Sequence, residues 1–146
     1  MTGRARLLWL LSLLFLGRVL GQVLVAFFGV TWLPPMSEWY SGLLSYPLLL
    51  PAQIAILALM VVMNTGVQRG TGPLASVSAR VARGIRIFSC VYFAGMVLRY
   101  ALTMALVPER RWLGGTIPIV FHWVLAGYLY VFSAHHLERA VRGRAS

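Results

Sequence analysis

Polar side chains that could bind an anion interrupt the long apolar runs of this sequence. Arg18 and Gln22 lie four residues apart, a spacing that places two side chains on one face of a helix. Gln53, Arg99 and His122 each lie within a different apolar run. An ionised side chain inside a membrane span costs at least about 2.5 kcal/mol, so each arginine needs a partner or a purpose. We expect these side chains to face the interior of a helical bundle, in its outer half.

The charges around these residues are unbalanced. Arg18 and Arg99 are accompanied, among nearby acids, only by Glu38 and Glu109. One interpretation is a structural network of interhelical hydrogen bonds with Glu38 as the counter-ion. A second is a site for an anionic ligand, such as a lipid phosphate or a carboxylate, and a third is that the arginines face a partner protein. The candidate anion site consists of Arg18, Gln22, Glu38, Gln53, Arg99 and His122.

The residue pattern favours a non-catalytic protein. No carboxylate lies within a predicted span, and neither G-x-S-x-G nor H-E-x-x-H occurs. His122, His135 and His136 all fall near one apolar run, whereas a haem with two histidine ligands inside the bundle needs them on facing helices. Cys90, the single cysteine, is expected to be a buried, inert thiol. We predict no metal and no cofactor, although His122 near Arg99 could serve as a base.

Composition identifies the class of protein that must position these residues. The chain has 146 residues, of which 60% are hydrophobic and 11% charged, a balance far from that of soluble proteins. A formal charge of +10 could suggest nucleic-acid binding. The arginines, however, are concentrated in short segments beside apolar runs, which is typical of the cytoplasmic loops of membrane proteins. We therefore predict an all-α membrane protein that binds no nucleic acid.

Four apolar runs are each about long enough to cross a bilayer as a helix. They cover residues 7–30, 47–63, 87–107 and 115–136 and predict a single domain, a four-helix transmembrane bundle. The first run could instead be a signal peptide cleaved after Gly21, but its apolar character resumes beyond that point. Gly17 and Gly21 form a small-xxx-small pattern, which permits close helix contact within the chain or in a dimer.

The segment before the third run has the pattern of an amphipathic helix on the cytoplasmic membrane surface. Between residues 74 and 86, apolar residues at near-helical spacing form one stripe, and Arg80, Arg83 and Arg86 lie beside it. We expect these three arginines to contact lipid headgroups. Pro34 and Pro35 end the first span, and the second is expected to be broken after Met63 by Asn64, Gly66, Gly70, Gly72 and Pro73.

The distribution of arginine predicts the orientation and the location. Nine arginines flank the spans on the side of the two termini and two on the other side, which places both termini in the cytoplasm and the chain in a plasma or inner membrane. The leading hypothesis is an accessory, assembly or lipid-binding protein of a bacterial-type inner membrane. The alternative is a membrane-embedded enzyme or carrier for an amphiphilic anion. Lipids are the expected partners, and membership of a larger complex or a homo-oligomer is left open.

Overall fold

The computed structural model describes residues 3–39, 45–107 and 115–145, and these contain helices but no strands. The helices are α1 (Gly3–Phe28), α2 (Met36–Trp39), α3 (Tyr46–Arg69), α4 (Ala79–Leu106) and α5 (Thr116–Ala145). Apart from the short α2, each is long and apolar enough to cross a membrane. The prediction of an all-helical chain with four such helices is confirmed. The turn expected at residues 108–111 lies outside the described residues.

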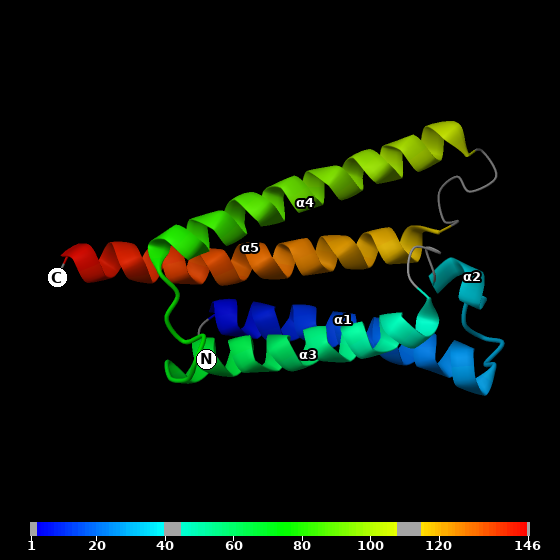
Figure 1. Cartoon of the computed structure of the whole chain (residues 1–146), viewed down its shortest axis with the longest axis horizontal. Helices are drawn as coiled ribbons and strands as arrows, with labels where there is room; N and C mark the ends of the chain where they lie inside the picture. The colour runs from blue at the N-terminus through cyan, green and yellow to red at the C-terminus, as the bar shows by residue number, and fades with distance from the viewer. Residues whose placement is uncertain (1–2, 40–44, 108–114, 146) are drawn as a thin grey trace.

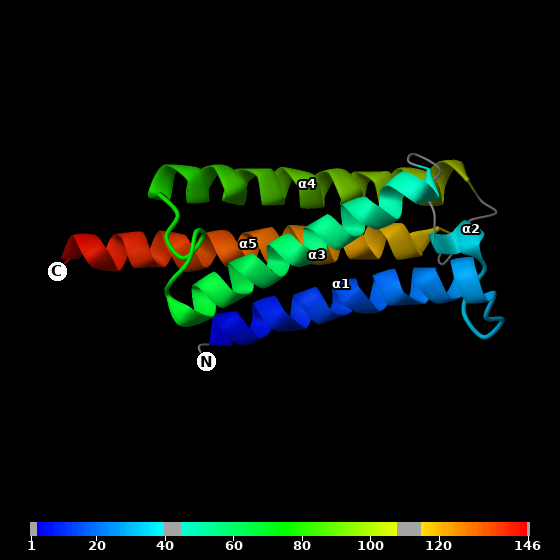
Figure 2. The same ribbon diagram turned by 60° about the horizontal axis from the view of Figure 1, so that its bottom comes forward.

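The four long helices run back and forth along one axis (Figure 1). α1 packs against both α3 and α5, and α4 packs along α5. The start of α1 lies at the same end of the molecule as the end of α5, and α2 lies at the opposite end. We call the end with α2 the outer end and the other the inner end. Figure 2 shows α3 crossing α1 at an angle, with the end of α3 beside the start of α1.

The ends of the helices follow from local backbone chemistry. Gly29, just after α1, has φ of +58°, a left-handed conformation that costs glycine little. α3 ends in the same way at Gly70, whose N–H donates to the carbonyl of Gly66 at 2.9 Å. Ser78 caps α4, since its hydroxyl accepts from the Val81 N–H at 3.3 Å.

The second span is longer than predicted, because Asn64 and Gly66 do not end it. Asn64 is buried, and its side-chain Nδ2 donates to the Ser12 hydroxyl of α1 at 2.9 Å. The Tyr128 hydroxyl of α5 donates to Asn64 Oδ1, also at 2.9 Å. At Gly66 a Cβ atom would lie 3.2 Å from the backbone nitrogen of Ala75, so the glycine allows the following loop to fold back closely. Both residues therefore support tertiary contacts inside the helix.

The amphipathic helix expected over residues 74–86 is not a separate element, and only its second half is helical, continuous with the third span. Residues 74–78 are not helical, and α4 begins at Ala79. Arg80, Arg83 and Arg86 belong to the first turns of α4, which continues to Leu106. Cys90, expected to be buried, is exposed on α4. The reason is that α4 packs mainly on α5, so most of its circumference has no protein neighbour.

Candidate functional site

Arg18 is a buried cation near the outer end of α1. It is only 9% exposed, and its guanidinium Nη2 donates to the backbone carbonyl of Trp39 at 3.4 Å. The guanidinium carbon lies 5.8 Å from the centre of the Phe121 ring, within reach of a cation–π contact. The Nε atom of Arg18 is buried and has no hydrogen-bond partner. The residue therefore retains the capacity to bind an acceptor.

Gln22 and Gln53 form a polar pair between α1 and α3. The Gln53 Nε2 donates to the Gln22 Oε1 at 3.0 Å, and the two side chains are 3% and 0% exposed respectively. This arrangement agrees with their expected inward orientation. One polar atom on each residue, Gln22 Nε2 and Gln53 Oε1, remains without a partner. An unpartnered polar atom in a buried site favours binding of a polar group there.

A cavity of about 220 Å³ lies beside these residues, bounded by α1, α2, α3 and α5. Three of its lining residues are polar: Arg18, Gln53 and His122. The others are mainly apolar: Phe15, Trp39, Leu49, Ile56, Pro118, Phe121 and Leu125. A cavity with one cation, two further polar groups and apolar walls matches a molecule with an anionic head and a hydrocarbon part.

His122 is held in place at the edge of this cavity by α4. Its Nδ1 atom forms a hydrogen bond with the Tyr92 hydroxyl, and the two rings are in edge contact with their centres 5.7 Å apart. The Tyr92 hydroxyl thus fixes the orientation of the imidazole ring. His122 is therefore a positioned polar group between α4 and the cavity.

Of the six predicted site residues, Gln22, Glu38 and Arg99 do not line this cavity, although Gln22 is paired with Gln53, which does. Glu38 forms no ion pair with Arg18 within 4.0 Å, and its carboxylate accepts instead from the backbone N–H of Gly115 at 2.6 Å. Among the described residues, the one ion pair within 4.0 Å joins Arg4 and Glu138. Arg99 lines a separate depression formed by residues of α4 alone. Figure 1 shows why: α4 tilts away from α5 toward its C-terminal end.

The three predicted lipid-surface arginines lie at the inner end of α4. Arg80 and Arg83 are exposed, and the Arg83 Nε donates to the Ala79 carbonyl at 3.3 Å. Arg86 is partly buried instead, since its Nη2 donates to the Tyr130 hydroxyl at 2.7 Å and its guanidinium lies over that ring. Arg86 therefore joins α4 to α5.

Trp39 is a site residue that the sequence did not identify, because a tryptophan beside prolines resembles an interfacial anchor. It is 7% exposed, and its indole Nε1 donates to the Pro34 carbonyl at 2.9 Å. Its ring rests on Gly21, where a Cβ atom would lie 2.6 Å from the ring. The sequence feature that could have indicated this contact is Gly21, which lies one helical turn after Arg18 and leaves space for a large side chain. Gly17, the other member of the pattern, has no such neighbour within 4 Å.

This contact predicts a difference between two glycine substitutions one turn apart. Gly21→Ala should displace the Trp39 ring and destabilise the protein by about 1–3 kcal/mol, the usual cost of overpacking. It should also weaken ligand binding, because the Trp39 carbonyl holds Arg18. Gly17→Ala is the matched control and should be neutral or stabilising by up to about 1 kcal/mol. Thermal unfolding in detergent measures both, and equal effects would contradict the predicted contact.

Comparisons with protein-family models, curated proteins and solved structures find no match to this chain. In the part of the chain that the structure describes, no three His, Cys, Asp or Glu side chains gather closely enough to hold a metal ion.

Proposed function

We propose that this protein is a non-catalytic lipid-binding protein that holds an amphiphilic anion in the outer half of its transmembrane helices. The observation that carries the proposal is Arg18, a buried cation beside a cavity of about 220 Å³ that forms no ion pair with a carboxylate of the described residues. An isolated charge in an apolar interior is unfavourable unless an opposite charge or water compensates it. A bound anion supplies that compensation.

The unpartnered atoms define the chemistry of the ligand. Arg18 Nε is a donor and needs an acceptor such as a carboxylate or phosphate oxygen. Gln53 Oε1 is an acceptor and needs a hydroxyl or N–H group. The walls formed by residues such as Phe15, Leu49 and Ile56 accommodate an alkyl segment. A lipid-like anion with a hydroxyl close to its charge satisfies all three requirements.

Titration of the purified protein with short amphiphiles tests this function. Decanoate should bind saturably, at one molecule per chain and at least tenfold more tightly than decanol, which has a similar alkyl part but no charge. Calorimetry in a detergent of longer chain measures both affinities. Equal affinities, or binding of decanoate that does not saturate, would refute an anion site.

Membrane placement and orientation belong to the same proposal. Large apolar side chains are exposed along the long helices, and contact with lipid explains such a surface better than contact with water. We place this chain in a plasma or inner membrane. Both termini then lie in the cytoplasm, since the inner end carries most of the arginines. The exposed Arg80 and Arg83 are then at the anionic cytoplasmic surface of the membrane. There each arginine contributes about 1 kcal/mol to the attraction between the protein and anionic lipid.

Reporter fusions test this orientation. A reporter fused after Ser146 should give a cytoplasmic signal, and one inserted between Pro34 and Ser37 should give an external signal. As the control, each site is fused in turn to a reporter that is active only outside the cell and to one that is active only in the cytoplasm. The two reporters should give complementary signals at each site. The same signal at both sites would contradict the proposed three crossings by α3, α4 and α5, which lie between them.

Two wider roles are compatible with such a site. An accessory or assembly role within a membrane complex is favoured by the largely unpartnered surface of α4. An enzyme or carrier for the same anion is favoured by His122, which Tyr92 positions at the cavity and which could exchange a proton with a bound molecule. Recovery of chemically changed amphiphile after incubation would select the enzyme, and recovery of unchanged amphiphile selects binding.

A further inference from the structure

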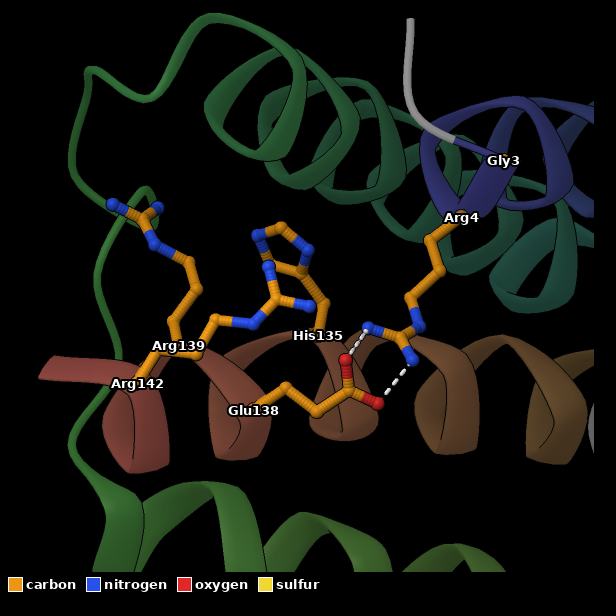
Figure 3. A pocket seen from close by; sticks show the side chains of 6 residues that line it. All are labelled: Gly3, Arg4, His135, Glu138, Arg139 and Arg142. Atoms are coloured by element: carbon orange, nitrogen blue, oxygen red, sulfur yellow. Dashed lines mark hydrogen bonds and ion pairs between the residues drawn. The ribbon is translucent and has the colours of Figure 1, made fainter. Parts of the chain in front are cut away.

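A second cavity lies at the inner end, far along the helices from the cavity beside Arg18, which we call the outer cavity. None of its lining residues lines the outer cavity. Its volume is about 500 Å³. Residues from the start of α1 and from the last turns of α5 line it, and Figure 3 shows their side chains. They are Gly3, Arg4, His135, Glu138, Arg139 and Arg142.

Positive charge is in excess within this cavity. Arg4 is held by Glu138 through two charge-assisted hydrogen bonds, which Figure 3 shows as dashed lines. This pairing neutralises one cation and joins the start of α1 to α5. Arg139 and Arg142 have no such carboxylate partner among the described residues. With His135 neutral, the six lining residues retain a formal charge of about +2, counted from the ionisation of free side chains.

The spacing on α5 gathers these side chains on one face. His135, Arg139 and Arg142 follow one another at four and three residues, so their side chains are neighbours on the helix surface. The Arg139 Nη1 also donates to the backbone carbonyl of Ala75 at 3.1 Å, which restrains that guanidinium. The Nε2 atom of His135 is buried and has no hydrogen-bond partner. The cavity thus offers two guanidinium groups without a hydrogen-bonded carboxylate among the described residues, and one imidazole nitrogen without a partner.

We infer that this inner cavity binds a phosphate group, supplied either by a lipid headgroup or by free phosphate. Guanidinium groups bind phosphate oxygens in pairs of parallel hydrogen bonds, and several acceptor oxygens on one phosphorus atom can bridge two arginines and an imidazole. Arg139 and Arg142 supply the principal contacts, and the His135 ring donates to a third oxygen once it turns its buried Nε2 toward the cavity. Glu138 opposes binding through its charge but positions Arg4 at the rim.

The test compares two double variants of the full-length protein in nanodiscs that remove equal charge. Arg139→Gln with Arg142→Gln should weaken phosphate-group binding at least tenfold. Arg6→Gln with Arg69→Gln is the matched control, because both arginines are exposed and lie outside the cavity lining. It should change the affinity less than twofold. Equal losses in the two double variants would overturn the site, since they would show a general effect of surface charge.

Three probes distinguish the source of the phosphate group: phosphatidylglycerol, diacylglycerol without phosphate, and inorganic phosphate. Native mass spectrometry should show one phosphatidylglycerol retained per chain and no specific diacylglycerol. Displacement of that lipid by inorganic phosphate identifies free phosphate as a ligand, and retention of the lipid identifies the headgroup. Failure of both phosphatidylglycerol and inorganic phosphate to bind saturably would overturn the inference.

A variant with the opposite expected effect guards against loss by misfolding. Glu138→Gln removes the acidic side chain and should tighten phosphate-group binding about threefold or more, because it raises the net positive charge and frees Arg4. Decanoate binding at the outer cavity should be unchanged in all of these variants. Weaker phosphate binding in Glu138→Gln, with decanoate binding intact, would also count against the site.

Discussion

Replacing Arg18 with Met is expected to weaken the binding of an anionic amphiphile by about 30-fold or more. The estimate corresponds to the 2 kcal/mol or more that is lost when one partner of a buried, hydrogen-bonded charge pair is removed. Arg18 is the one cation that lines the outer cavity among the described residues. The unliganded protein should not lose stability, because replacing a buried charge with apolar volume is often neutral or stabilising. Calorimetric titration with decanoate and thermal unfolding measure the two effects.

Arg99→Met is the matched control for this variant. It removes the same charge and introduces the same side chain within a membrane helix. Arg99, however, does not line the outer cavity and lies in the depression along the C-terminal part of α4. Decanoate affinity should therefore change less than about threefold, the size of a weak, screened charge effect. Equal losses in the Arg18 and Arg99 variants would mean that general positive charge, and not the cavity, attracts the ligand. Arg18→Lys should restore part of the affinity, since it retains the charge but loses Nε.

Arg18→Met also distinguishes a ligand site from a structural ion pair between Arg18 and Glu38. If Arg18 and Glu38 were coupled, Arg18→Met would destabilise the protein and an added Glu38→Gln would restore part of the loss. The structure gives Glu38 a different partner, the Gly115 N–H. The effects of the two substitutions on the free energy of unfolding should therefore add within about 0.5 kcal/mol. A larger coupling energy would favour the structural pair.

The sequence predicts the helices of this protein well because their signal is local. A span needs about 20 apolar residues, and each predicted run corresponds to a long helix. The inward orientation of Gln22 and Gln53 was also predictable, since an amide in an apolar span is costly unless it finds a partner inside the protein. The pairing of these two residues with each other was not, because it depends on how α1 and α3 cross.

The contacts that complete the outer cavity depend on the order in which the helices pack. Trp39 reaches α1 because a short helix folds back over Gly21, which no periodic pattern reveals. Arg99 is also an arginine within a long apolar helix, yet that helix packs mainly on α5 and diverges from it (Figure 1). Residue type therefore identified the candidates, and tertiary arrangement selected among them.

Asn64 is the position where sequence reasoning and structure differ most in their consequences. The sequence suggested a helix terminator, whereas the side chain links three helices through Ser12 and Tyr128. The Ser12 hydroxyl also donates to the Leu8 carbonyl, and the single proton of the Tyr128 hydroxyl is shared with the Met60 carbonyl at 3.2 Å. Each partner of Asn64 thus has a second hydrogen bond, which limits the damage when Asn64 is removed.

Asn64→Leu should lower the free energy of unfolding in detergent by about 1–3 kcal/mol. It removes two interhelical hydrogen bonds, each worth about 0.6 kcal/mol on average in membrane proteins and up to about 1.7. Tyr128→Phe should cause a smaller loss, because it leaves the bond from Asn64 to Ser12 in place. Thr65→Val is the control on the neighbouring residue, since the Thr65 hydroxyl bonds only to carbonyls of its own helix. It should change stability by less than about 0.5 kcal/mol. Equal effects of Asn64→Leu and Thr65→Val would show that these bonds do not hold the three helices together.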